Sequence, residues 1–138
     1  AQQTIVFKLG EECYGVDIFR GNEIIRLREI TPSPRTEEHI KGLVNLRGKT
    51  IPVVDLKIRL GLGSYEPSPS TRIIVLDSDD GHVGIIVDAV REVLTLESDS
   101  IENPSSVVTE LDAEFLLGVA KHASGLISIL DLDRALAA

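Results

Sequence analysis

This sequence has no tryptophan, a single cysteine and no long hydrophobic run. Cys13 is the only cysteine among 138 residues and cannot form an internal disulfide, which is typical of a protein in a reducing cytosol. Aromatic residues make up only 4% of the chain, so it lacks the stacking platforms that binders of single-stranded nucleic acid use. The longest aliphatic run covers the four residues 73–76. That is far short of the ~20 residues that a helix needs to cross a bilayer.

Basic residues are also scarce, because 14 Lys and Arg stand against 22 Asp and Glu and give a formal charge of −8. This balance argues against sequence-independent binding of nucleic acid and against docking on an anionic membrane. No basic and hydrophobic leader precedes the first strand-like segment, so we expect no export signal. The hydrophobic fraction of 43% is enough for a core, and the length allows one domain of ordinary size or two very small ones.

The chain contains two pairs of similar segments. Residues 4–18 and 72–90 both alternate apolar and polar side chains around a polar turn, which predicts a β-hairpin in each. They align without a gap at an offset of 84 − 15 = 69 residues, with Gly15 over Gly84. Residues 39–60 align over 115–136 at an offset of 118 − 42 = 76. Two matched blocks in the same order indicate an internal duplication.

Modules of ~65 residues bury only ~60% of their unfolded surface, so we expect the two halves to share an interface or exchange strands. Short helices are predicted at two equivalent places. Asp55 and Asp131 each follow an apolar strand and can accept a hydrogen bond from the free N–H groups of a first helical turn. Gly61 is placed to end the first of these helices. The proline-rich residues 67–70 predict a semi-rigid joint between the halves.

Two segments are similar to ligand-binding loops but have the wrong spacing. In the segment 42–50, five residues rather than four separate the two glycines, and a strand rather than a helix follows, so we do not expect a nucleotide site. The segment 77–82 is rich in carboxylates, as a calcium loop is. Its glycine is fifth rather than sixth, so we interpret it as a solvated hairpin turn.

Nothing in the sequence indicates catalysis. His39, His82 and His122 have no metal-ligand spacing with one another or with Cys13. The nucleophile elbow G-x-S-x-G is missing as well. We therefore expect no catalytic residue, no cofactor and no metal, and we expect that the protein is not an enzyme.

One turn breaks the symmetry of the duplication. Asn45-Leu46-Arg47-Gly48 in the first half aligns with residues 121–124 in the second, where Arg47 has no counterpart. A turn that only closes a hairpin does not require arginine. A surface arginine without a role is the simplest interpretation. The alternative is a guanidinium that is held on a carboxylate of its own chain or of a partner, with Glu23 as an internal candidate.

The segment NLRGKTIPVVDLKIRLGL, residues 45–62, resembles the hallmark segment of the CheW family, the adaptor proteins of bacterial chemotaxis. The segments 7–18, 84–94 and 125–136 are similar to the family in the same order, so the resemblance covers residues 4–136. It implies a mainly β fold of two intertwined, five-stranded, SH3-like β-barrel subdomains with short helices. We expect one CheW-like domain over residues 1–138, with barrel halves near 15–68 and 69–138 and with exchange of the N-terminal strand between them.

The resemblance also implies residues that contact a receptor or a kinase. Arg47 matches the family's arginine in the NLRG turn, and Glu23 matches the glutamate that this arginine engages. Aliphatic side chains at the seam between the barrels are predicted to line a groove for a receptor helix. Gly21 departs from the family pattern, which has an aliphatic residue there. The predicted contact residues are Glu23, Gly42, Val44, Arg47, Gly84, Val87 and Val90.

The function that the resemblance implies is that of a non-enzymatic scaffold. It would link the cytoplasmic tips of transmembrane chemoreceptors to the regulatory domain of the histidine kinase CheA. The protein would be cytoplasmic and recruited to membrane-associated receptor arrays, without binding nucleic acid or inserting into the membrane. An alternative stays open, namely a CheW-like regulatory domain of a CheA kinase or of an adaptor fused to a receiver domain.

Overall fold

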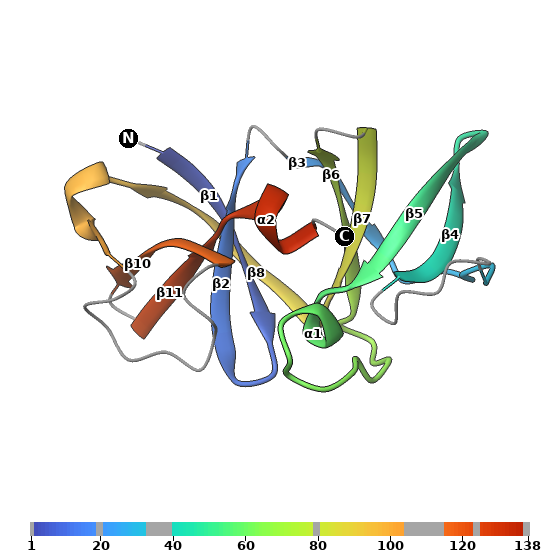
Figure 1. Cartoon of the computed structure of the whole chain (residues 1–138), viewed down its shortest axis with the longest axis horizontal. Coiled ribbons are helices and arrows are strands. Elements are labelled where there is room, and N and C mark those ends of the chain that lie inside the picture. The colour runs from blue at the N-terminus through green and yellow to red at the C-terminus, as the bar shows by residue number, and fades with distance from the viewer. Residues whose placement is uncertain are drawn as a thin grey trace.

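The computed structural model describes residues 2–18, 21–32, 40–78, 81–103, 115–122 and 125–136. Their strands form two sheets that lie side by side along the long axis of the molecule (Figure 1). Sheet A has the strand order β8-β1-β2-β11-β10-β9, and sheet B has the order β3-β6-β7-β5-β4. No helix within the described ranges is long and apolar enough to cross a membrane.

The strands of sheet A are β1 (Gln2–Leu9), β2 (Glu12–Asp17), β8 (Ala89–Leu96), β9 (Ile101–Glu102), β10 (Leu116–His122) and β11 (Gly125–Leu130). The strands of sheet B are β3 (Gly21–Arg26), β4 (Ile40–Leu46), β5 (Lys49–Asp55), β6 (Arg72–Ser78) and β7 (Gly81–Val87). The helical elements are α1 (Leu56–Arg59), the 3₁₀ turn η2 (Ser98–Ser100) and α2 (Leu132–Leu136).

The mainly β fold with short helices is confirmed, but the two sheets are not closed into barrels. In sheet B the outer strands β3 and β4 do not pair with each other, although an isolated bridge joins Thr31, beyond the end of β3, to Leu43 of β4. In sheet A the outer strands β8 and β9 do not pair with each other either. Sheet A also has six strands rather than the expected five, because the two-residue strand β9 is added beside β10. The predicted closed five-stranded barrels are therefore replaced by two open sheets.

The internal duplication is confirmed in the pairing of the strands. In sheet A, Val6 lies opposite Gly15, and in sheet B, Val75 lies opposite Gly84, at the expected offset of 84 − 15 = 69 residues. Each of these glycine-bearing strands then pairs in parallel with the last strand of a repeat, β2 with β11 and β7 with β5. Leaving β9 aside, equivalent strands of the two repeats thus occupy equivalent places in the two sheets. The order β8-β1-β2-β11-β10 of sheet A corresponds to β3-β6-β7-β5-β4 of sheet B.

Each sheet combines strands from both repeats. The hairpin β1–β2 comes from the first repeat but lies in sheet A between β8 and β11, which belong to the second. The hairpin β6–β7 comes from the second repeat but lies in sheet B between β3 and β5. Sheet membership therefore does not follow the division into residues 15–68 and 69–138, and that division stays a prediction about subdomain boundaries.

The central hydrophobic core draws on both sheets, which explains why the halves are held together. Its largest fully buried side chains include Phe7, Leu9 and Tyr14 of sheet A and Ile74, Leu76 and Ile85 of sheet B. A second core lies on the other face of sheet B, and a third contains residues of β1, β8, β10 and β11 of sheet A. Strand β7 supplies side chains to the first and second cores, so residues 83–87 are buried on both faces.

Both predicted helix starts are confirmed. Asp55 accepts a hydrogen bond from the backbone N–H of Lys57 at 3.1 Å, and Asp131 accepts one from that of Arg134 at 3.3 Å. Gly61 follows α1 with a φ of 76°, and the N–H groups of residues 61 and 62 bond back to residues 58 and 57. This is the Schellman pattern of a helix end, in which a residue in the left-handed region satisfies the last carbonyls.

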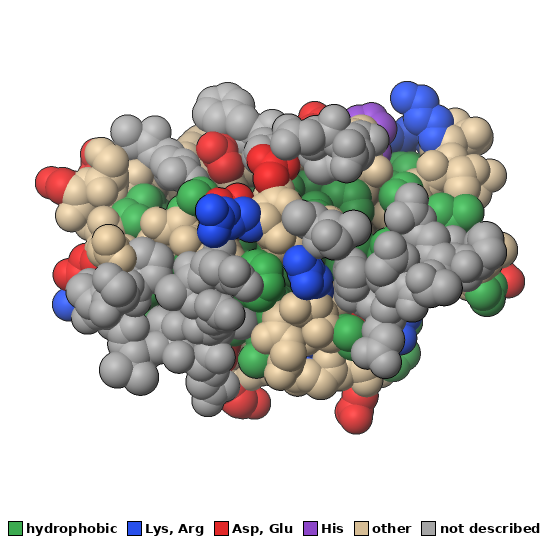
Figure 2. Space-filling view, in the orientation of Figure 1, with side chains coloured by type: hydrophobic (Ala, Val, Ile, Leu, Met, Phe, Trp, Pro, Cys, Tyr) green, Lys and Arg blue, Asp and Glu red, His purple; other side chains and the backbone are tan. Residues whose placement is uncertain are grey.

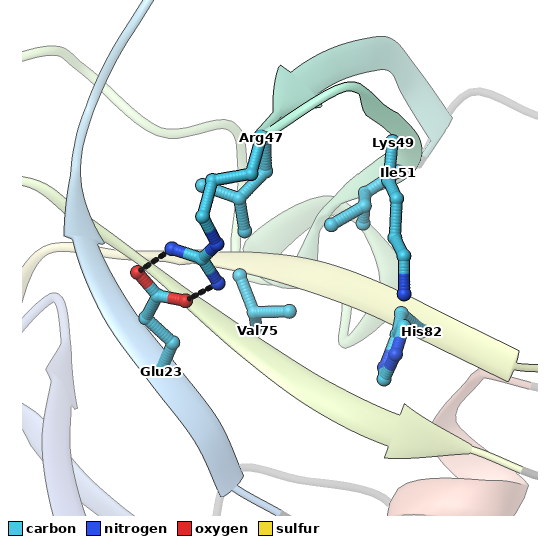
Figure 3. A pocket seen from close by; sticks show the side chains of 7 residues that line it. Glu23, Arg47, Lys49, Ile51, Val75 and His82 are labelled. Atoms are coloured by element: carbon cyan, nitrogen blue, oxygen red, sulfur yellow. Dashed lines mark hydrogen bonds and ion pairs between the residues drawn. The ribbon is translucent and has the colours of Figure 1, made fainter.

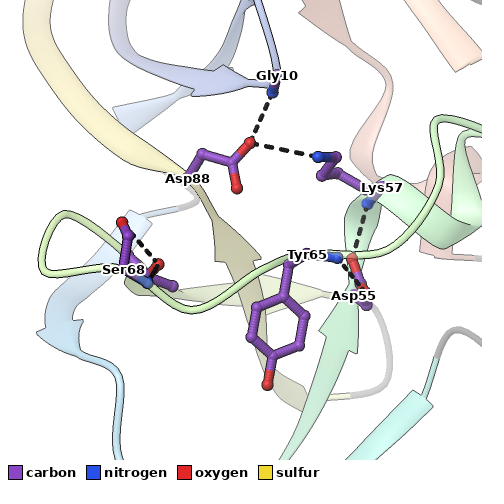
Figure 4. Close-up of polar contacts among 7 residues, drawn as sticks. Gly10, Asp55, Lys57, Tyr65, Ser68 and Asp88 are labelled. Carbon is purple, nitrogen blue, oxygen red and sulfur yellow. Dashed lines mark hydrogen bonds and ion pairs between the residues drawn. The ribbon is translucent and has the colours of Figure 1, made fainter.

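Polar contacts also cross the seam between the sheets. The Asp88 carboxylate, between β7 and β8, accepts a hydrogen bond from the Gly10 N–H at 2.6 Å and lies 3.6 Å from Lys57 Nζ of α1 (Figure 4). Arg59 of α1 donates to the Ala135 carbonyl of α2 at 2.6 Å, and its guanidinium lies 5.0 Å from the ring centre of Phe115. The two short helices are thus tied to each other as well as to their own sheets.

Candidate protein-binding site

The turn between β4 and β5 places Arg47 at the surface in an unusual backbone conformation. Leu46 pairs with Lys49, so the loop has only two residues, Arg47 and Gly48, with φ values of 51° and 81°. Two positive φ angles are the pattern of a type I′ hairpin turn, in which asparagine and glycine are preferred. Arg47 is the only described residue other than glycine with a positive φ. The turn itself does not need this side chain, because Asn45 Oδ1 already accepts the N–H of Gly48 at 3.1 Å.

The Arg47 guanidinium reaches back to the edge strand β3 and forms a two-pronged contact with Glu23. Arg47 Nη1 donates to Glu23 Oε2 at 3.0 Å, and Arg47 Nη2 donates to Glu23 Oε1 at 2.5 Å (Figure 3). The contact predicted between these two residues is confirmed. Paired, parallel hydrogen bonds of this kind fix the orientation of both groups more tightly than a single contact does. The side chains are 71% exposed for Arg47 and 29% exposed for Glu23, so the pair lies at the surface.

The pair shifts the titration of both groups. Hydrogen bonding by Arg47 holds the pKa of the Glu23 carboxyl below its usual value, and the positive charge of Arg47 adds to this effect. The same hydrogen bonds raise the pKa of the Arg47 guanidinium. Each member of the pair therefore favours the charged form of the other.

The ion pair borders a shallow hollow of about 290 Å³ on the face of sheet B (Figure 3). Its apolar floor is made of Leu46, Ile51 and Val75, which belong to the second core. Lys49 and His82 complete the rim, and His82 Nδ1 lies 2.7 Å from Asp77 Oδ1. An apolar floor with a charged rim can receive a side chain of another protein.

The residues around this hollow offer no catalytic arrangement. Among the described residues, no group of three or more His, Cys, Asp and Glu could hold a metal ion. The carboxylate of Glu23 is engaged by Arg47, and none of the described residues that line the hollow is a serine or a cysteine.

Two further predicted contact residues support the strand that carries the turn. Gly42 of β4 is buried, and a Cβ at this position would overlap the carbonyl oxygen of Thr31, which bonds to the N–H of Leu43. Gly42 is therefore required for the close approach of two backbones. Val44 is 1% exposed and belongs to the second core, beneath the turn.

The remaining three predicted contact residues lie elsewhere and largely inside. Gly84 is buried in β7, where a Cβ would lie 2.8 Å from Cγ2 of Ile73. Val87 is fully buried in the central core, and Val90 is partly buried against it. Val44, Val87 and Val90 do not form one open groove in this structure, since Val44 belongs to a different core. Their part in partner binding stays a prediction.

Sequence reasoning did not single out Lys49 and His82 as site residues. His82 is paired across the β6–β7 hairpin with Asp77, and β7 lies beside β5, which carries Lys49. The pairing of a hairpin can be predicted from its alternating pattern. The local pattern does not predict that β7 pairs in parallel with β5, and this pairing brings His82 near the Arg47 turn.

Comparison with known proteins identifies the family. A family model described as the CheW-like domain matches residues 3–138. The chain belongs to this family. It is 33% identical over 136 residues to the chemotaxis protein CheW of Bacillus subtilis, covering 98% of this chain and 86% of that protein. It is 29% identical to the chemotaxis protein CheW of Treponema pallidum, covering 96% of this chain and 80% of that protein.

A solved structure of the family has the same fold. The scaffolding protein TtCheW from Thermoanaerobacter tengcongensis is 42% identical and has a TM-score of 0.90, covering 99% of this chain and 88% of that chain. The similarity extends over 99% of this chain, so the overall fold described above is one that is known from experiment.

Proposed function

We propose that this CheW-like protein is a non-enzymatic scaffold that couples transmembrane chemoreceptors to the histidine kinase CheA in bacterial chemotaxis. Support comes from relatives that are named chemotaxis protein CheW and from a structural neighbour that is named a scaffolding protein. These names favour an adaptor over the regulatory domain of a kinase. The protein would act in the cytoplasm, at receptor arrays on the membrane.

The single structural observation that carries the proposal is the Arg47–Glu23 pair. An arginine in a strained turn position, held by two hydrogen bonds at the surface, is costly for folding and is absent from the second repeat. Such a residue is explained by recognition of another protein. The hollow beside it supplies apolar contact, while the rigid pair supplies direction and register.

Gly42, Val44, Gly84, Val87 and Val90 take a supporting part in this proposal. Gly42 and Val44 are buried in the strand that leads to the turn and would support it, while Gly84, Val87 and the partly buried Val90 lie elsewhere and would support the fold as a whole. A scaffold without chemistry transmits a signal only if the two states of the receptor bind it with different free energies. Rigid packing behind the contact surface makes such a difference possible, because the surface cannot adapt equally well to both states.

The test is co-purification with a receptor signalling tip and a CheA regulatory domain, together with kinase activity in reconstituted arrays. Arg47→Asn is the best variant, because asparagine favours a positive φ and keeps the turn. Arg91→Ala, which removes an exposed arginine from β8, is the matched control. We expect Arg47→Asn to fold normally and to lose coupling, with Arg91→Ala unaffected. Wild-type binding and kinase activation by Arg47→Asn would reject the role of this pair.

A further inference from the structure

Two arginines lie directly opposite each other in sheet B. Arg26 of the edge strand β3 pairs with Arg72 of β6. Like charges at directly opposite positions of an antiparallel pair destabilise a sheet, so the fold gains nothing from this arrangement. In the part of the chain that the structure describes, neither guanidinium forms an ion pair with a carboxylate. The repulsion between the two arginines is therefore not relieved by a neighbouring acidic side chain in these ranges.

The duplication shows that the fold does not require these arginines. At the offset of 69 residues, the equivalent positions in sheet A are 26 + 69 = 95 and 72 − 69 = 3. Thr95 and Gln3 pair with each other there in the same way, and neither carries a charge. The arginine pair is thus an addition to one sheet only. A choice of residues that breaks a local rule without a structural gain is typical of a functional site.

The two arginines share their face of the sheet with an exposed aliphatic side chain. Ile25 is buried in the second core, so its neighbours in β3, Ile24 and Arg26, point to the opposite face. Ile24 is 43% exposed and lies opposite Ile74, which belongs to the central core. Ile24, Arg26 and Arg72 therefore form one small surface at the edge of sheet B, which we call the arginine patch.

The arginine patch has the geometry and the charge to receive a carboxylate. Arg72 Nη1 donates to the carbonyl oxygens of Pro69 and Thr71, each at 2.9 Å, which orients the guanidinium without neutralising its charge. Arg26 is exposed, and the described residues give it no hydrogen-bond partner for its side chain. A guanidinium presents paired donors that match a carboxylate. In a chain with a formal charge of −8, two adjacent arginines are a local exception that attracts an anionic group.

We propose that the arginine patch binds a segment of a partner polypeptide that carries a carboxylate next to a large apolar residue. The carboxylate would accept hydrogen bonds from Arg26 and Arg72 and relieve their repulsion, and the apolar side chain would cover Ile24. A free phosphate would satisfy the arginines but leave Ile24 uncovered. Arg72 also lies opposite Val87, one of the predicted contact residues. The proposal therefore rests on the proposed function, since it states which chemistry the coupled partner presents at this edge of sheet B.

The test uses the 138-residue protein labelled with ¹⁵N, without receptor or kinase, so its result is separate from that of the co-purification test. The probe is a capped peptide with the sequence Gly-Glu-Leu-Glu-Leu-Gly, and the control peptides have glutamine or lysine at both glutamate positions. We expect the glutamate peptide to shift the amide signals of Ile24, Arg26 and Arg72 in a saturable way at low ionic strength. The shifts should weaken as salt is added, because exposed charges are screened. The lysine peptide should shift none of these signals.

Matched variants locate the binding. Arg26→Gln and Arg72→Gln each remove one charge, and we expect each to weaken binding of the glutamate peptide about fivefold. The double variant should show no saturable binding. Arg91→Gln, which removes an exposed arginine from β8, is the matched control and should bind like the wild type. Arg26→Gln should unfold at the same or a higher urea concentration than the wild type, because it removes the repulsion, so a loss of binding is not a loss of fold.

Three results would overturn the proposal. They are the absence of saturable shifts at millimolar glutamate peptide, equal shifts of the same amides by the glutamine peptide or by inorganic phosphate, and full binding by the double variant. If these amides shift with protein concentration alone, a second copy occupies the patch, and the proposed partner is wrong. A protein that binds the glutamate peptide but neither receptor tip nor kinase domain would contradict the proposed function and not this inference. The reverse result would contradict this inference alone.

Discussion

Replacement of Thr4 by valine should make this protein more stable. Thr4 lies in β1 with no exposed surface, and its Oγ1 has no hydrogen-bond partner. A hydroxyl that is buried without a partner costs ~1–3 kcal/mol, because it has given up its bonds to water. Valine has almost the same shape and keeps the methyl group that lies over Gly15. The equivalent residue in sheet B, at 4 + 69 = 73, is the fully buried Ile73, so the fold accepts an apolar side chain here.

We therefore expect Thr4→Val to raise the free energy of unfolding by ~1 kcal/mol or more, measured by urea denaturation with an unchanged slope. In a domain of this size the midpoint of thermal unfolding should rise by about 4 °C. The matched control is Thr71→Val. Thr71 is also buried, but its Oγ1 accepts the Ser68 N–H at 2.9 Å, so the same substitution should cost ~1 kcal/mol. The reasoning fails if the two valine variants change stability in the same direction.

Three further changes should have measurable effects. Gly84→Ala should lower the free energy of unfolding in urea by ~1–3 kcal/mol, because the added methyl group would lie 2.8 Å from Cγ2 of Ile73 in β6. An unchanged unfolding curve would show that the sheet relaxes around the methyl group. Asp131→Ala should cost ~1 kcal/mol through the lost helix cap, and Asp55→Ala should cost more, since it leaves two N–H groups unbonded; equal costs would contradict this ranking. In an NMR titration, the pKa of Glu23 should be below its usual value and should rise in Arg47→Ala. Because the pKa of Glu23 is lowered in the folded state, the stability that the pair contributes is present above the pKa of Glu23 in the unfolded chain. It is lost as the pH falls through the pKa of Glu23 in the folded protein. Identical titration of Glu23 in both proteins would refute the contact in solution.

Figure 2 shows charged side chains of both signs on one face of the molecule. On the face that it shows, the Lys and Arg side chains drawn in colour are scattered among acidic and uncharged ones. The Arg47–Glu23 pair on sheet B is one place where charges of opposite sign are held in a defined geometry.

Local patterns in the sequence determined much of this protein. The alternation of apolar residues predicted both hairpins, and the two offsets predicted a duplication that the strand registers reproduce. Asp55 and Asp131 marked the starts of both helices, because a capping carboxylate acts within three residues of its own position. The missing counterpart of Arg47 in the second repeat drew attention to its contact with Glu23.

Only the tertiary structure decided which sheet each hairpin joins. The two repeats have similar patterns, so either hairpin could pair with either β5 or β11 as far as local chemistry is concerned. The parallel pairs β2–β11 and β7–β5 join residues that are far apart in sequence, and no local signal encodes them. The same exchange buries Val87 and Gly84 between layers, where the sequence suggested a contact surface. The tertiary structure also decided that neither pair of outer strands joins into a continuous ladder, and in sheet B only the single bridge between Thr31 and Leu43 links the two edges.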